Sequence, residues 1–313
     1  MEDYPRSLRE FEARFSTEEA CREYLSGLRW PEGFVCPGCG GAKSWAAARG
    51  LLVCAGCGHQ ASVTAGTIFA RSHKPLTTWF RAIWWVTSQK TGASALGLQR
   101  VLGSCSYKTA WTWLQKLRRA MVRPGRERLS GRVEVDETYL GAVEEGMPGR
   151  KTLKKALIAV AAEEDGKAVG RIRMRRIPNA SARSLHGFVL GAVEAGSVVH
   201  TDGWDGYAGL EAKGYTHEVT PIGDGDASKL LPRVHRVVSL LKRWLLGTHQ
   251  GAVSREHLDA YLDEFTFRFN RRTSRHRGKL FFRLLQNAVV VEPVPYRDII
   301  RQVRGRKSRS HKM

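Results

Sequence analysis

Residues 131–136, Gly131-Arg-Val-Glu-Val-Asp136, decide the fold of the central part of the chain. The segment begins with a glycine, alternates valine with charged residues and ends in an aspartate. A period of two between apolar and polar residues is typical of a strand that buries one face. We therefore expect a strand here, with the carboxylate of Asp136 close to its end.

The segments that follow predict a mixed α/β domain. A Gly-Met-Pro-Gly turn at 146–149 separates the first strand from the second. Three strands, a helix, a strand, a helix, a strand and two helices follow one another, which is the order of an RNase H-like domain with helices flanking a mixed sheet. After the first strand, we expect strands at 156–161, 169–177, 197–202 and 217–220, and helices at 180–193, 204–213, 232–246 and 254–270.

Acids on the first and fourth strands of such a sheet can converge. Here these are Asp136 and Asp202, and a third ligand would come from the helix after the fifth strand. Divalent metals held between such groups activate a water or a 3′-hydroxyl for in-line displacement at phosphorus. Two strand-end aspartates by themselves are more often turn or capping residues, so the pair needs support from elsewhere in the chain.

Four cysteines near the N-terminus indicate a zinc site. A helix is expected at 16–28, with Ser16 and Glu19 as a capping box. Two Cys-x-x-Cys pairs follow it and supply the four thiolates that a closed structural zinc site takes. Two disulfides or a redox pair are the alternatives, but disulfides are rare inside cells and a redox motif needs one copy. We therefore expect a zinc ribbon, whose ligands are Cys36, Cys39, Cys54 and Cys57.

A strongly basic block follows the ribbon and predicts three helices, at about 76–90, 94–102 and 107–122. A glycine at 103 separates the last two, which is the helix-turn-helix pattern. The alternative is a three-helix spacer with a solvated basic face. The residues expected to contact DNA phosphates are Lys108, Lys116, Arg118 and Arg119.

The distribution of charge supports a nucleic-acid partner. The 313 residues include 51 lysines and arginines against 30 acids, a net charge of +21. Residues 71–130 carry +11 and residues 232–313 carry +13, whereas 1–70 carry −1 and 131–231 carry −2. No stretch approaches the about 20 apolar residues of a spanning helix, and no signal peptide is recognised, so we expect a cytoplasmic, nucleoid-associated protein.

Motifs along nearly the whole chain carry a resemblance to a known family. The chain resembles a bacterial insertion-sequence transposase with an N-terminal zinc ribbon and a DDE-type RNase H-like catalytic domain. The motifs are Arg29-Trp-Pro-Glu-Gly-Phe-Val-Cys-Pro-Gly-Cys39, Tyr107-Lys-Thr-Ala-Trp111, Val133-Glu-Val-Asp-Glu-Thr-Tyr139, Thr201-Asp-Gly-Trp-Asp-Gly-Tyr207, Leu241-Lys-Arg-Trp-Leu-Leu-Gly-Thr-His249 and Tyr261-Leu-Asp-Glu-Phe-Thr-Phe-Arg-Phe-Asn-Arg-Arg272.

The resemblance implies a catalytic set. The family has two aspartates, a variable third residue and a lysine seven positions later, which here match Asp136, Asp202, His235 and Lys242. Seven residues are two helical turns, so His235 and Lys242 share one helix face. We expect Asp136, Asp202 and His235 to hold magnesium. Because imidazole suits softer ions than Mg²⁺, we also expect this site to accept Mn²⁺ well.

Three further acids compete for a role. Glu264 is the rival third ligand, although it fits an ion pair with Arg268 at i+4 equally well. Glu134 shares the strand face of Asp136 and can support the site from behind. Glu137 should point to the opposite face, because successive strand residues alternate.

The predicted organisation is multidomain. It comprises a helix and zinc ribbon at 1–66, a helix-turn-helix region at 67–130, the catalytic domain at 131–290 and a basic tail at 291–313 that contacts phosphates. By resemblance, the protein binds the terminal inverted repeats of its element as duplex DNA, cleaves their 3′ ends and joins them to target DNA, as a homo-oligomer. A catalytically silent DNA-binding relic and an RNase H-like nuclease acting on RNA–DNA hybrids are the alternatives.

Overall fold

The computed structural model describes residues 2–103, 105–123, 125–141, 155–220, 230–251 and 253–301. The chain divides into two compact units, one of residues 1–123 with 273–313 and one of residues 124–272. The expected turn at 146–149 and the end of the basic tail lie outside the described residues.

The second unit contains a five-stranded mixed sheet in the order β6-β5-β4-β7-β8. Strands β4, β5 and β6 pair antiparallel, β7 pairs in parallel with β4, and β8 pairs in parallel with β7. Strands were predicted at all five places, and β4 and β5 extend beyond their predicted ends. The strands are β4 (Arg132–Leu140), β5 (Ala156–Asp165), β6 (Ala168–Ile177), β7 (Val198–Thr201) and β8 (Thr216–Val219).

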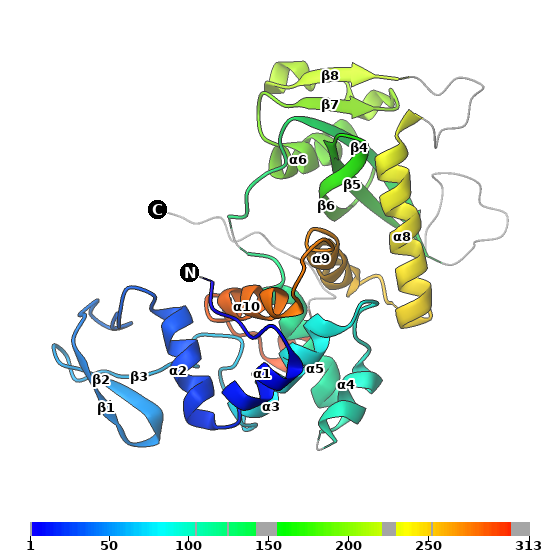
Figure 1. The fold of residues 1–313 in the computed structure, drawn as a ribbon. Helices are drawn as coiled ribbons and strands as arrows, with labels where there is room; N and C mark the ends of the chain where they lie inside the picture. Colours follow the sequence, from blue (N-terminus) through cyan, green and yellow to red (C-terminus); the bar gives the residue numbers. More distant parts are fainter. Residues whose placement is uncertain are drawn as a thin grey trace. The chain divides into compact units, whose positions relative to one another are not determined.

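Helices cover both faces of this sheet, as Figure 1 shows. On one face, α6 (Ala182–Ala192) packs in an apolar cluster with Val133 and Val135 of β4. On the other face, α8 (Pro232–His249) and α9 (Leu258–Phe269) pack on the alternate residues of β5 and β6. Since Val133 and Val135 face α6, alternation turns Glu134 and Asp136 toward α8.

The prediction of a helix at 204–213 is wrong. Two short 3₁₀ turns, η3 (Asp205–Tyr207) and η4 (Glu211–Lys213), occupy this stretch instead. Gly209 between them has φ +85°, a backbone conformation that an α-helix cannot contain. Tyr207 and Leu210 of this stretch are buried in the α6 cluster.

The first unit contains the cysteine-rich segment as a three-stranded antiparallel sheet and a set of packed helices. Its second helix begins after Thr17, whose side chain accepts the Ala20 N–H, so the capping box predicted at Ser16 is not the observed cap. Three helices near the chain ends were not predicted, α1, α10 and α11. The elements are α1 (Leu8–Arg14), α2 (Glu18–Arg29), β1 (Ser44–Ala47), η1 (Ala48–Gly50), β2 (Leu51–Cys54), β3 (Gln60–Ser62), α3 (Leu76–Ser88), α4 (Ala95–Leu102), α5 (Tyr107–Ala120), α10 (Arg277–Ala288) and α11 (Tyr296–Arg301).

Aromatic packing holds the helices of the first unit together. Trp79 of α3 stacks on Trp113 of α5 with ring centroids 3.6 Å apart, and Phe281 of α10 packs against Phe80 of α3. The helix α10, which the predicted catalytic domain included, thus belongs to the compact unit of the N-terminal helices. Among the described residues, no helix is both long enough and apolar enough to cross a membrane.

Candidate active site and zinc ribbon

The parallel pairing of β4 with β7 brings Asp136 and Asp202 to the same level of the sheet. Val133 pairs with Val199 and Glu134 with His200. Two residues further along each strand direction stand Asp136 and Asp202, the latter directly after the end of β7. The register therefore places Asp136 and the position directly after β7, Asp202, at one level of two neighbouring strands.

His235 joins Asp136 from the first turn of α8. Its Nε2 lies 3.9 Å from Oδ2 of Asp136, and the other carboxylate oxygen of Asp136 accepts the N–H of Glu137 at 2.7 Å. Lys242 stands two turns further along α8 and is exposed. It lines a cavity of about 900 Å³ together with Thr138 and Leu245, so it lies beside the site and not within it.

A network of hydrogen bonds shapes the segment that carries Asp202. The Trp204 N–H donates to Oδ1 of Asp202 at 3.1 Å, and the indole N–H donates to the carbonyl of Ala180 at 2.8 Å. The hydroxyl of Tyr207 donates to Oε2 of Glu137 at 2.8 Å. Burial first, and then the negative charge of Glu137, raises the pKa of Tyr207 well above its usual value, so the phenol stays a donor.

The rival acid, Glu264, does not belong to this group of side chains. It lies on α9, is fully buried and forms an ion pair with Arg268 at 2.8 Å. The i+4 pairing that the sequence left open is therefore the observed arrangement.

The donors around Asp136 suit a divalent cation. Asp136 supplies an oxygen ligand of the kind that Mg²⁺ prefers, and His235 supplies a nitrogen that favours Mn²⁺. Among the described residues, these two and Asp202 do not form a group whose ligand atoms all lie within 4.8 Å of one another. The carboxylate of Asp136 is only 17% exposed, and His235 approaches it from a second element.

The four cysteines of the first unit form a second group with metal-binding geometry. Their Sγ atoms all lie within 4.8 Å of one another. Cys36 Sγ is 3.7 Å from Cys57 Sγ, and Cys39 Sγ is 3.6 Å from Cys54 Sγ, close to the about 3.8 Å edge of a tetrahedron with Zn–S bonds of ~2.3 Å. The N–H groups of Cys57 and Gly56 lower the pKa of the Cys54 thiol to about 7.

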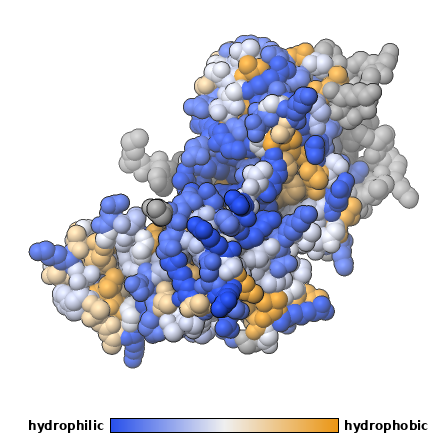
Figure 2. All heavy atoms as spheres, viewed as in Figure 1, coloured by the Kyte–Doolittle hydropathy of each residue, from blue (hydrophilic) through white to orange (hydrophobic). Residues whose placement is uncertain are grey.

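The strands around these cysteines bury little else. In β1 no residue is fully buried, and in β2 only Cys54 is. Figure 2 shows apolar surface over this ribbon, where Val35 is 51% exposed. Since such a small sheet lacks an apolar core, a bound ion is the element that would hold the two cysteine knuckles together.

Two segments of the chain match transposase families. Residues 128–270 match the ISXO2-like transposase domain, and residues 16–60 match the transposase zinc-ribbon domain. The chain thus combines a transposase zinc-ribbon domain with a transposase domain. No curated protein matches the chain. The matched transposase domain contains Asp136, Asp202, His235 and Lys242, and the matched ribbon contains all four clustered cysteines.

Two of the transposase's expected DNA-contacting residues point into the protein. Arg118 of α5 is 1% exposed, and its guanidinium donates to the carbonyl of Ala93. The Lys116 ammonium donates to the carbonyl of Ile68 at 3.3 Å, and burial lowers the pKa of Lys116. The expectation that these two side chains face phosphates does not hold in this structure, because the inner face of α5 is wider than the apolar spacing suggested.

The other two expected contacts lie at the surface of α5 or near it. Lys108 is exposed at the start of the helix, and its ammonium lies 4.2 Å from the ring centroid of Tyr296 in α11. Arg119, near the end of α5, is half-buried. Between α4 and α5, Gly103 has a left-handed backbone with φ +65°, as the expected turn requires.

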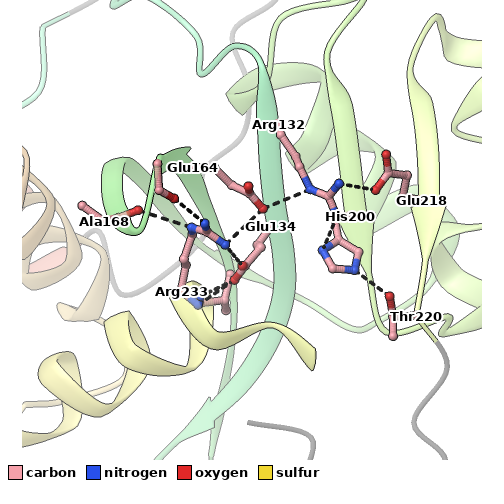
Figure 3. A network of polar contacts seen from close by, with 10 residues as sticks. Arg132, Glu134, Glu164, Ala168, His200, Glu218, Thr220 and Arg233 are labelled. Carbon is pink, nitrogen blue, oxygen red and sulfur yellow. Dashed lines mark hydrogen bonds and ion pairs between the residues drawn. The ribbon is translucent and has the colours of Figure 1, made fainter. Parts of the chain in front are cut away.

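The transposase domain holds a second polar cluster that the sequence did not reveal, shown in Figure 3. Glu134, Glu164 and His200 have ligand atoms within 4.8 Å of one another. Two guanidinium groups already occupy the space between them, because Arg233 contacts both glutamates and Arg132 contacts Glu164 and His200. A cation would face two fixed positive charges there, so we interpret this cluster as an ion-pair network.

Proposed function

We propose that this transposase binds the terminal inverted repeats of its insertion sequence and catalyses divalent-metal-dependent 3′-end cleavage and strand transfer. The observation that carries the proposal is the placement of Asp136 and Asp202 at one level of adjacent parallel strands, with His235 3.9 Å from Asp136. The element order and the mixed sheet support an RNase H-like fold for the catalytic domain.

Asp136, Asp202 and His235 would hold Mg²⁺ or Mn²⁺. When bound, such ions supply positive charge for the attacking and leaving oxygens of an in-line displacement at phosphorus. The protein's part is to fix the donors. The Glu137 N–H orients one oxygen of Asp136 so that the other faces His235, and the Trp204 N–H orients Asp202.

Lys242 would position the DNA end. Its exposed ammonium stands two helical turns from His235, at the edge of a cavity beside the site. A lysine there neutralises a phosphate without competing for the metal-binding carboxylates. End recognition would come from α4 and α5 as a helix-turn-helix, with Lys108 and Arg119 as the remaining phosphate contacts, and from the zinc ribbon. Because two element ends must meet, we propose a homo-oligomer as the working form.

The test uses duplex oligonucleotides that carry the ends of the element, intact or pre-nicked at the 3′ end. We expect the wild-type protein to nick the intact ends and to join the nicked ends to a second duplex in Mg²⁺ or Mn²⁺. Asp136→Asn and Asp202→Asn should abolish both reactions while end binding persists. Binding without any joining by the wild type would favour a silent relic, and preferential cleavage of RNA–DNA hybrids would favour a nuclease.

A further inference from the structure

We propose that Glu134 and Glu137, the acids on either side of Asp136 in β4, are positioning residues that fix the other two parts of the active site. Glu134 would fix the helix that carries His235, and Glu137 would fix the segment that carries Asp202. The proposal rests on the function proposed above, because it takes these three residues as the metal site.

Glu134 caps the start of α8. Its Oε2 accepts the N–H groups of Arg233 and Val234 at 2.8 and 2.9 Å, and Oε1 accepts from the Arg233 guanidinium at 2.9 Å. The residue at the helix's own cap position, Leu231, provides no side-chain acceptor. The first N–H groups of a helix have no partner within it, and a carboxylate also suits the positive end of the helix dipole. A strand residue therefore supplies the cap that α8 lacks.

This contact sets the spacing of the active site. Asp136 stands two residues after Glu134 on the same strand face, and His235 stands two residues after Arg233 in the same helix turn. The contact between Glu134 and Arg233 thus joins the strand to the helix two residues before Asp136 and His235. The joint is buried, since Glu134 is 1% exposed.

Arg233 extends the joint across the sheet, as Figure 3 shows. Its guanidinium also lies 3.1 Å from Glu164 and donates to the carbonyls of Gly166 and Ala168. Glu164 is held in turn by Arg132, which pairs with Glu218 of β8. Charges alternate along this series of side chains, so each group has an opposite partner. The start of α8 is thereby tied to β4 and to the β5–β6 turn.

Glu137 makes the equivalent joint on the opposite face. Its carboxylate accepts the hydroxyl of Tyr207, a fully buried residue five positions after Asp202. With the Trp204–Ala180 hydrogen bond, this contact holds both ends of η3 against the domain. The strand pairing of β7 ends at Thr201 and does not hold the segment that follows. We therefore infer that the Tyr207–Glu137 hydrogen bond determines the position of Asp202 relative to β4.

The test measures Mn²⁺ binding to the full-length protein without DNA, by electron paramagnetic resonance of the free ion. Removing a residue that orients a metal ligand typically costs about 10- to 100-fold in affinity. We expect Glu134→Gln and Tyr207→Phe each to weaken Mn²⁺ binding by about 10-fold. Glu163→Gln is the matched control, because Glu163 is also a buried sheet acid paired with an arginine, and within the described part of the chain its hydrogen bonds go to Arg171 and Ser130.

Double variants separate the two routes. In a His235→Ala background, Glu134→Gln should have no further effect on Mn²⁺ binding, whereas Tyr207→Phe should keep its full effect. In an Asp202→Asn background, Tyr207→Phe should have no further effect on Mn²⁺ binding, whereas Glu134→Gln should keep its full effect. Equal effects in both backgrounds, or a loss by Glu163→Gln as large as that by Glu134→Gln, would overturn the positioning roles. If Asp136→Asn and Asp202→Asn themselves leave Mn²⁺ binding unchanged, the proposed metal site fails first, and the positioning roles fail with it.

Discussion

The imidazole Nε2 of His235 lies 3.9 Å from Oδ2 of Asp136, across the junction of α8 with β4. The gap is too long for a hydrogen bond but fits two ligands that share one ion. The nitrogen comes from the helix α8 and the oxygen from the strand β4, and the second oxygen of Asp136 is already engaged by a backbone N–H.

This relationship predicts how His235 variants depend on the metal. We expect His235→Ala to lower strand transfer by about 10-fold or more, because one of three donors is lost. His235→Glu should retain activity in Mg²⁺, because a carboxylate is a harder ligand than an imidazole. It should also reduce the ratio of the joining rate in Mn²⁺ to the joining rate in Mg²⁺. The measurement is the rate of joining pre-nicked ends in each metal. His186→Ala, on the opposite face of the sheet, is the control. Full strand transfer by His235→Ala would exclude a ligand role.

The exposed Lys242 predicts how the affinity for the element end depends on salt concentration. Replacing it with alanine should weaken binding of the element end and reduce the slope of log affinity against log salt by about 1, as expected for one lost phosphate contact. Lys242→Arg should preserve the slope. The control is Lys167→Ala, because Lys167 is an exposed lysine in the β5–β6 turn. An unchanged slope for Lys242→Ala would mean that this ammonium does not meet a phosphate.

Local sequence patterns were sufficient to predict the strands of the sheet and the candidate residues on and beside its central strand. The alternation of valines predicted β4, and the predicted strand order put Asp136 and Asp202 on neighbouring strands, with which the parallel pairing of β4 and β7 agrees. Helical spacing predicted α8 and with it the common face of His235 and Lys242. These features depend on period and order, both of which a single sequence contains.

What the sequence could not supply depends on contacts between distant residues. The cap that Glu134 gives to α8 joins residues about 100 positions apart, and no local signal marks it. The same holds for Arg118, whose burial depends on the packing of α4 and α5 against one another. At η3 the local apolar spacing was misleading, because tertiary packing and not helical period buries Tyr207.

The cysteine geometry predicts one zinc ion per chain. We expect purified protein to contain stoichiometric zinc by mass spectrometry, and Cys36→Ser or Cys54→Ser to lose it and to expose the ribbon to proteolysis. A tetrahedral thiolate site needs all four ligands, and the ribbon strands bury too little to stay folded alone. Cys105→Ser is the control, because Cys105 is half-buried and lies outside the cluster. Retention of stoichiometric zinc by both ribbon variants would exclude this site.

Gly206 gives the sharpest prediction for the segment that carries Asp202. A Cβ added there would lie 2.6 Å from the carbonyl oxygen of Ala180 and 2.7 Å from Trp204 Nε1, the two atoms that form the hydrogen bond behind Asp202. Gly206→Ala must therefore break or displace that bond. We expect it to lower the free energy of unfolding by about 1–3 kcal/mol, the usual cost of overpacking, and to speed hydrogen exchange at the Tyr207 amide.

The matched control for that substitution is Gly187→Ala in α6. An added Cβ there meets only the end of the Arg175 side chain, at 3.9 Å. Alanine in the interior of a helix should raise the unfolding free energy by about 0.5–1 kcal/mol relative to glycine. Urea unfolding of the full-length variants measures both effects. Equal stability of the two variants would show that the segment yields to the added methyl, and the Trp204–Ala180 bond would then not determine the position of Asp202.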